Sequence, residues 1–215
     1  MGAVHLSFDN GPHPEGTPRV LRELERRGLQ ASFFVLGREL ATPEGMALAE
    51  RIRDAGHRLG NHSYTHETPL GQDPRPDAVA RELEATQALL DQVWTGERWF
   101  RPFGGGGVLG PHLLSPAALA WLERERASCV LWNSVAGDWR DPQGWVERAL
   151  ADVEGQELSL IVLHDVVPEA MAALPRFLDE LIARGHSVSE ALPEDCVPVV
   201  RGEARPQVER YLSAS

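Results

Sequence analysis

The chain has 215 residues, 42% of them hydrophobic and 25% charged, which is typical of a soluble globular protein. This length suits one domain with a substantial core, and we interpret residues 1–215 as a single domain. The formal net charge of -11, without any run of lysines or arginines, argues against partners such as nucleic acid or an anionic membrane surface.

The two cysteines, Cys129 and Cys196, are far apart and form no Cys-x-x-Cys pair, so neither a disulfide framework nor a cysteine zinc site is predicted. We expect Cys129 to be a buried small hydrophobe. The segment Met1–Phe8 enters a strand-like pattern without a signal sequence, so a cytoplasmic protein is expected unless the chain has been trimmed. No apolar window approaches transmembrane length.

Strand-like apolar runs alternate with helices along the chain. The predicted strands are Val4–Phe8, Gln30–Leu36, His57–Gly60, Arg98–Arg101, Ser128–Trp132, Leu158–Leu163 and His186–Ser189. Four helix starts are predicted where an N-cap side chain precedes proline, at Thr17-Pro18, Thr42-Pro43, Ser115-Pro116 and Asp141-Pro142. Gly28, Gly56 and Gly185 are typical helix ends, and further helices are expected near Asp77–Val93 and Pro168–Arg184.

These repeated β-α units lack a nucleotide-type glycine fingerprint, which favours a barrel over an open doubly wound sheet. The predicted fold class is therefore α/β, a distorted (β/α) barrel of about seven parallel strands. The proline-containing tail from about residue 190 to 215 is expected to wrap the surface, and no linker divides the chain.

Polar residues that are capable of catalysis or metal binding fall just after the predicted strands. They are Asp9 and Asn10, His62 and His66, Arg101, Asp138, and His164 with Asp165. In a parallel barrel these strand ends open on one face, where active sites are built. We therefore expect five strand ends to converge on one pocket.

His62 and His66 are either ordinary polar residues on a loop or, if they lie in a helical turn that points them the same way, two ligands of a metal site. Asp9 is either a turn residue before Gly-Pro or a general base beside a metal-bound water. Arg101 either pairs with a surface carboxylate or holds that base ionised. His164 is either a core histidine or, paired with Asp138, the general acid. Together these residues indicate a metal hydrolase.

The chain resembles the polysaccharide deacetylase family of carbohydrate esterases, whose domain is a distorted (β/α) barrel with five short motifs. The residues that carry the resemblance are Ser7-Phe8-Asp9-Asn10-Gly11-Pro12, His62-Ser63-Tyr64-Thr65-His66, Arg101-Pro102-Phe103-Gly104, Asp138-Trp139 and Leu163-His164-Asp165. Their order and approximate spacing agree with the family, and the resemblance runs from Ala3 to about Ser189.

The resemblance implies a role for each motif residue. Asp9 would be the catalytic base tuned by Arg101, and His164 the acid tuned by Asp138. His62 and His66 would hold a divalent metal, zinc or else cobalt or manganese, together with the residue at position 10. Phe103, Trp139 and Leu163 would bind the substrate, the last two around the acyl methyl group.

Three departures from the family pattern stand out. Asn10 replaces the usual aspartate ligand, so we expect the metal to be weakly held. Val135 stands where the family often has another aspartate. The run Gly104-Gly105-Gly106-Gly107 suits close backbone approach to a ligand, a mobile lid, or simply a flexible loop.

The interpretation that joins these observations is a hydrolase of C–N bonds, acting on an acetylated amino sugar or oligosaccharide with a divalent metal. One alternative is a metal-independent amidase on a small non-sugar amide or ureide, resembling the allantoinase-like relatives. Another is a carbohydrate-binding homologue without catalysis, against which the retention of Asp9, Arg101, Asp138 and His164 speaks. The sequence leaves the substrate, the metal and the oligomeric state undetermined.

Overall fold

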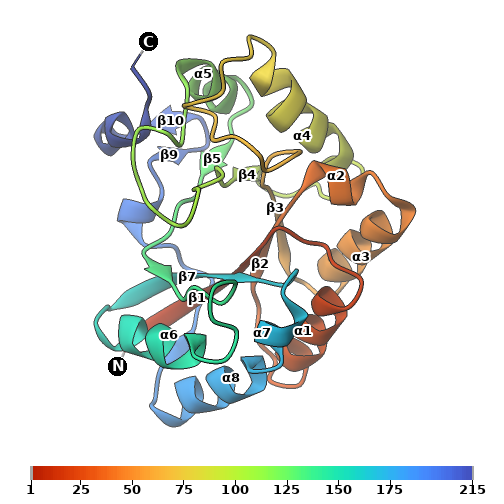
Figure 1. The fold of residues 1–215 in the computed structure, drawn as a ribbon, viewed down its shortest axis with the longest axis vertical. Helices are drawn as coiled ribbons and strands as arrows, with labels where there is room; N and C mark the ends of the chain where they lie inside the picture. Colours follow the sequence, from red (N-terminus) through yellow and green to blue (C-terminus); the bar gives the residue numbers. More distant parts are fainter. Residues whose placement is uncertain (1, 215) are drawn as a thin grey trace.

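The computed structural model describes residues 2–214, and its strands follow one another around a ring (Figure 1). The strands are β1 (Ala3–Asp9), β2 (Ser32–Val35), β3 (Arg58–Asn61), β4 (Trp99–Phe100), β5 (Ser128–Cys129), β6 (Ser134–Val135), β7 (Leu158–His164), β8 (Ser187–Val188), β9 (Val199–Val200) and β10 (Glu203–Ala204). The helices are α1 (Gly16–Glu25), α2 (Gly37–Leu40), α3 (Pro43–Asp54), α4 (Ala85–Leu90), α5 (Pro116–Arg124), α6 (Trp145–Glu154), α7 (Pro168–Met171) and α8 (Leu174–Ala183). A π-helical segment η1 (Ala80–Glu84) precedes α4, and 3₁₀ segments η2 (Glu194–Cys196) and η3 (Pro206–Tyr211) lie near the C-terminus.

The sheet order is β10-β9-β5-β4-β3-β2-β1-β7-β6, with β8 paired to β1 off this path. All pairings from β1 to β8 are parallel, and the ladder does not join β5 to β6, so the barrel is distorted. The predicted fold class is confirmed. The two-residue strand β6 was not predicted, because Ser134–Val135 is not part of an apolar run.

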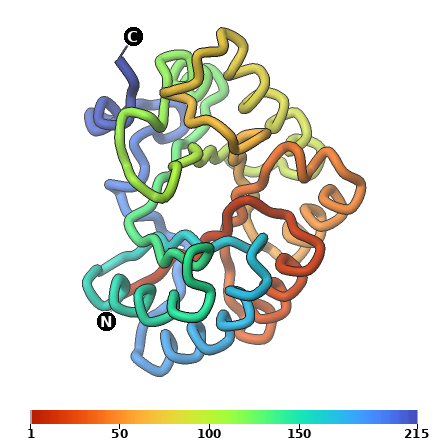
Figure 2. The backbone as a smooth tube through the Cα atoms, in the orientation of Figure 1, coloured from red at the N-terminus to blue at the C-terminus, as the bar shows by residue number. Residues whose placement is uncertain are grey.

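The C-terminal segment does more than wrap the surface, which corrects the expectation for residues 190–215. Strand β9 pairs antiparallel with β5, and Val199 and Cys196 are buried. In Figure 2 this blue segment runs beside the green segment at the left edge of the ring. The tail therefore covers the side of β5 that no parallel neighbour occupies, which an irregular pattern with three prolines did not reveal.

The core lies on both sides of the strands because successive side chains of a strand point to opposite faces. The outward residues pack under α1, α3, α6 and α8, and they include Phe8, Phe33, Ile161 and Leu163. A smaller cluster contains Phe34, Trp99, Val130, Leu160 and Cys196, on the inner face of the ring. Cys129 is buried and free, as expected.

Two of the four predicted helix caps are present. The Thr42 hydroxyl accepts from the Gly45 N–H at 3.0 Å, and the Ser115 hydroxyl accepts from the Ala118 N–H at 3.1 Å. Asp141 instead caps a turn at Gly144 ahead of α6, and Thr17 lies inside α1 with its hydroxyl directed elsewhere. The helix expected over Pro168–Arg184 is divided into α7 and α8.

Within residues 2–214, no helix has the length and apolar character needed to cross a membrane.

Candidate functional site

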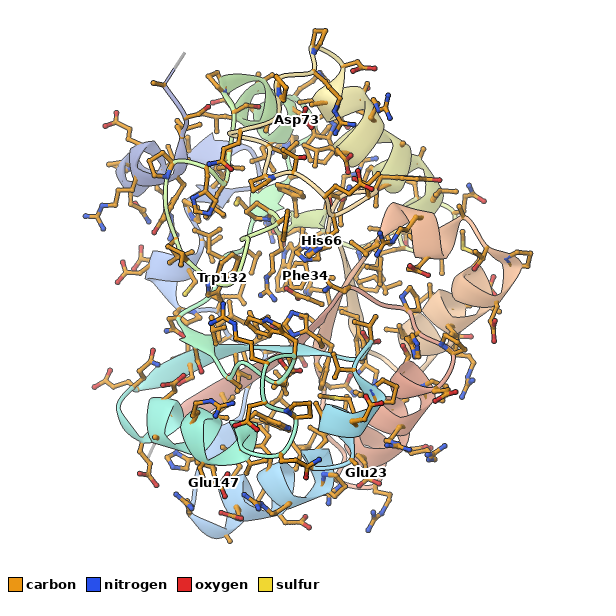
Figure 3. The ribbon with its side chains drawn as sticks, in the orientation of Figure 1. Glu23, Phe34, His66, Asp73, Trp132 and Glu147 are labelled. Atoms are coloured by element: carbon orange, nitrogen blue, oxygen red, sulfur yellow. The ribbon has the colours of Figure 1, made fainter. Side chains whose placement is uncertain are left out.

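The strand ends converge as predicted, on a cavity of about 240 Å³. Asp9 is the last residue of β1 and is the register partner of His164, the last residue of β7. His62 follows β3, and Arg101 follows β4. Among the predicted site residues, Asp9, Asn10, His62, His66, Phe103, Trp139 and His164 line the cavity. Figure 3 places the labelled His66, Phe34 and Trp132 near the centre of the molecule, whereas Glu23 and Glu147 lie at its periphery.

Asp9 forms a buried ion pair with Arg101, at 2.7 Å between Oδ1 and Nη1. The guanidinium is 0% exposed, and it also donates to the Ser7 hydroxyl at 2.8 Å and packs over the Phe34 ring at 3.9 Å. Burial disfavours the ionised carboxylate, but the charge and hydrogen bond of Arg101, together with the charges of His62 and His164, outweigh it, and the pKa of Asp9 is held below its usual value. Asp9 is therefore ionised at neutral pH, as a general base must be.

His164 forms the second polar pair, with Asp138 from the loop after β6. The Asp138 carboxylate accepts from His164 Nδ1 at 2.8 Å and from the His164 backbone N–H at 2.8 Å. A carboxylate only accepts, so Nδ1 carries a proton and Nε2 is left for the cavity side. Burial lowers the pKa of His164, but the hydrogen bond and charge of Asp138 outweigh it and raise the pKa above its usual value.

The two histidines of the His-x-x-x-His motif lie in a loop, not in a helical turn. Ser63 and His66 have positive φ values of 69° and 56°, and the two imidazole centroids are 4.9 Å apart. His62 Nδ1 donates to the Arg101 carbonyl at 2.7 Å, which leaves Nε2 as an acceptor 3.6 Å from Asp9 Oδ2. Burial lowers the pKa of His62 and lowers that of His66 to about 3, so both rings are neutral at neutral pH, the form that metal ligation requires.

Glu82 supports this histidine loop, and the sequence analysis missed it. Its carboxylate accepts from the Tyr64 N–H, the Thr65 N–H and the Thr65 hydroxyl. The available signal was an acidic residue four positions from Ala78 and from Thr86 on the buried face of a helix.

Asn10 supplies a polar atom suited to a cation. Its backbone has a φ of 76°, and its side-chain oxygen is buried with no hydrogen-bond partner within residues 2–214. The described residues include no cluster of three or more His, Cys, Asp or Glu side chains able to hold a metal. A three-ligand site here would therefore need Asn10 with His62 and His66. The uncommitted Asn10 oxygen and the neutral imidazoles fit a divalent ion.

Asp165 lies beneath the turn that carries Asn10. The Thr17 hydroxyl donates to Asp165 Oδ2, and a Cβ added at Gly11 would lie 2.4 Å from the same oxygen. Burial raises the pKa of Asp165 to about 7. Thr17 was predicted to cap a helix, and its hydroxyl instead donates to one oxygen of this buried carboxyl group, whose Oδ1 has no hydrogen-bond partner within residues 2–214.

Leu163 does not line the cavity, and this corrects its predicted place in the substrate pocket. Its neighbours Val162 and His164 face the cavity, so strand alternation turns Leu163 toward the helices, where it is 0% exposed. Phe103 and Trp139 do line the cavity, with the Phe103 centroid 3.9 Å from that of His66.

The glycine run Gly104–Gly107 forms one wall of the cavity, and side chains hold its carbonyl groups. Trp132 Nε1 donates to the Gly107 carbonyl at 2.9 Å, and Arg140 donates to that of Gly106 at 3.3 Å. A Cβ at Gly104 would lie 2.5 Å from the Trp132 ring, so the backbone packs directly against it. These contacts are with the protein's own side chains, and close backbone approach to a ligand and a mobile lid both stay predictions.

Comparison with known proteins gives consistent matches. Residues 2–107 match the family model described as polysaccharide deacetylase. A chitooligosaccharide deacetylase of Sinorhizobium fredii is 30% identical over 210 residues, covering 90% of this chain and 91% of that protein. The structure described as T48 deacetylase with substrate has a TM-score of 0.70 and 26% identity, and the match covers 88% of each chain. A CE4 family pseudoenzyme from Bacillus anthracis, 22% identical with a TM-score of 0.73 over 87% of this chain and 63% of that one, shares the fold.

Proposed function

The chain belongs to the polysaccharide deacetylase family of hydrolases that cleave carbon–nitrogen bonds other than peptide bonds, and we propose that it removes the acetyl group from an acetylated amino sugar or oligosaccharide with the help of a divalent metal. The observation that carries the proposal is that Asp9 and His164 line the same cavity. Their surroundings move the pKa of the carboxyl group down and that of the imidazole up. Neighbouring groups with opposed pKa shifts are what a base and an acid require.

In the proposed reaction, Asp9 takes a proton from water as the water oxygen attacks the amide carbon. His164 gives the proton on Nε2 to the nitrogen as the carbon–nitrogen bond breaks, which yields acetate and a free amine. Arg101 keeps Asp9 ionised, and Asp138 keeps His164 protonated and oriented. Trp139, whose ring meets that of His164 edge-on at 4.8 Å, excludes water from one side of the acid.

His62, His66 and Asn10 would hold the metal. When bound, such an ion polarises a carbonyl group and lowers the pKa of a bound water. The hydrogen bond from His62 Nδ1 to the Arg101 carbonyl fixes the tautomer that presents Nε2 for ligation.

The experiment that tests the proposal is an activity screen. N-acetylglucosamine, chitin oligomers, small cyclic amides and ureides are each incubated with zinc, cobalt, manganese or a chelator, and product acid and amine are measured. We expect metal-dependent release of acetate from a chitin oligomer. Turnover of ureides alone, undiminished by the chelator, would refute the proposal.

The replacement of the usual aspartate by Asn10 favours a second candidate function. The metal-independent amidase needs only the Asp9 and His164 pairs, and an amide oxygen binds a divalent ion less strongly than a carboxylate. The chelator arm of the same screen separates the two candidates, because only the amidase keeps full activity without metal.

Asn10→Asp is expected to tighten zinc binding by ~10–100-fold, because a full negative charge replaces an amide dipole among the ligands. Substitutions of residues that only hydrogen-bond to metal ligands already change affinity by this much. Aspartate tolerates the positive φ at this position. Titration calorimetry of both proteins with zinc provides the measurement. Equal affinities would mean that Asn10 is not a ligand.

Asp138→Asn is expected to move the alkaline limb of the pH–rate profile to lower pH. Asp138 raises the pKa of His164, and the acid must be protonated, so activity is lost as pH rises through that pKa. Without the charge of Asp138 the pKa of His164 falls, and the loss of activity begins at a lower pH. His164→Ala should remove this limb and lower turnover by roughly 10²-fold or more. If Asp138→Asn keeps the wild-type limb, the limb does not report His164.

A further inference from the structure

Glu82 is a buried carboxylate that the proposed mechanism does not use. It is 2% exposed and lies in the π-helical segment η1, one turn before α4. The segment η1 runs directly into α4, and the Glu82 carbonyl accepts from the Thr86 hydroxyl at 2.8 Å. π-helical turns are rare and occur often at functional sites. This acidic side chain on a buried helix face therefore needs a partner that justifies its burial.

The partner is the backbone between the two cavity histidines. Glu82 Oε2 accepts from the Tyr64 N–H at 3.0 Å and from the Thr65 N–H at 2.8 Å, and Oε1 accepts from the Thr65 hydroxyl at 2.8 Å. Hydrogen bonds to an ionised acceptor are roughly twice as strong as neutral ones. The carboxylate thus holds both peptide N–H groups of the loop at once.

A cation closes the other side of this carboxylate. Arg75 Nη2 lies 3.3 Å from Glu82 Oε1, and the same guanidinium is held by Asp73. In Figure 3 the labelled Asp73 lies above His66 in the same half of the molecule. The segment that follows His66 therefore brings Arg75 to the same carboxylate that holds Tyr64 and Thr65.

The backbone on each side of Tyr64 and Thr65 has an unusual conformation. Ser63 and His66 both have positive φ, which non-glycine residues adopt at a cost and only when the surrounding structure imposes it. The Glu82 contacts are made by the two residues between them. This conformation brings the His62 and His66 rings to 4.9 Å, although the loop is not helical.

We propose that Glu82 is the positioning residue of the metal site, which clamps the 63–66 turn so that His66 is presented beside His62 as a ligand. The inference rests on the proposed function, because it assigns Glu82 a role toward the metal that His62, His66 and Asn10 would hold.

The test compares zinc affinities of Glu82→Ala, Glu82→Gln and Glu84→Ala by titration calorimetry. Glu82→Ala removes all three loop contacts and is expected to weaken zinc binding 10–100-fold. Glu82→Gln keeps an oxygen for the two N–H groups, and the Thr65 hydroxyl can accept from its NH₂, but the contact with Arg75 is lost, so this variant should retain more affinity than Glu82→Ala. Glu84, which is exposed and bonded to Arg124, is the matched control, and its removal should change nothing.

Amide hydrogen exchange on metal-free protein reports the clamp directly. Exchange at Tyr64 and Thr65 should accelerate in Glu82→Ala and remain slow in Glu82→Gln. Where the alanine variant does not fold, Thr65→Val, which removes the hydroxyl contact alone, should still weaken zinc binding several-fold. Unchanged affinity in Glu82→Ala beside normal wild-type binding overturns this inference alone. If the wild type releases acetate without binding zinc, the metal has no part in the proposed function. That result overturns both the inference on Glu82 and the proposed metal-assisted reaction.

Discussion

Asp9→Asn is expected to lower turnover by roughly 10²-fold or more, because a general base contributes on that order and an amide cannot accept the proton. The substitution keeps the shape of the side chain, and its oxygen can still accept from Arg101. The measurement is the initial rate of acetate release at saturating substrate, together with the metal content of each protein. Metal content should stay nearly constant, since Asp9 is not among the proposed ligands.

The control for this experiment is Asp54→Asn, the same chemical change at the exposed end of α3. It should keep the wild-type rate. Asp9→Asn also leaves Arg101 without a charged partner, so rates must be compared well below the unfolding temperature of the variant. A variant that is folded, loaded with metal and fully active would place the base elsewhere.

The parts of the fold that were predictable are those with a strong local pattern. Ser159–Leu163 is a continuous buried run, and it forms the interior of strand β7 (Leu158–His164). Strand β6 and the pairing of β9 with β5 were not predictable, because Ser134–Val135 is not part of an apolar run and Val199–Val200 lies in an irregular tail directly after Pro198. The same limit applies to Thr17, whose best partner, Asp165, lies 148 residues away.

The candidate site was predictable from position, and its fine geometry was not. Polar residues at the ends of parallel strands gather at one face of the ring, and Asp9 and His164 line the cavity there, whereas Arg101 and Asp165 lie beside it. The resemblance implied a pocket position for Leu163, but strand alternation turns this side chain to the helix side of β7. The spacing of His62 and His66 predicts that their rings meet only if the segment is helical. In the structure the segment is a loop, and the contacts of Glu82 hold it so that the rings are equally close.

Arg101→Leu is expected to lower the free energy of unfolding at pH 7 by about 3–5 kcal/mol, the usual loss when one partner of a buried ion pair is removed. The remaining Asp9 carboxylate is 3% exposed and would lose its strongest stabilising charge. Ser7 and the carbonyl groups of Val130 and Leu131 would also lose their donor. Urea unfolding followed by circular dichroism gives the measurement, with Arg184→Leu at an exposed ion pair as a control that should leave the midpoint nearly unchanged.

The pH dependence of this loss identifies its origin. In the wild type the pKa of Asp9 is lowered on folding, so the pair contributes stability above the unfolded pKa, and this contribution is lost as pH falls through the folded pKa. In Arg101→Leu, burial acts without the opposing charge and the pKa of Asp9 rises, so the variant gains relative stability when the carboxyl group is protonated. The difference between the two proteins should therefore be largest at neutral pH and should shrink as pH falls from the raised pKa of Asp9 in the variant to its lowered pKa in the wild type. A difference that is independent of pH would mean that lost packing against Phe34, and not the ion pair, accounts for the effect.

Arg101→Lys separates the effect of charge from that of packing and hydrogen bonding. Lysine keeps the charge beside Asp9 but cannot reproduce the planar set of donors, so this variant should show the pH dependence of the wild type while remaining less stable than it.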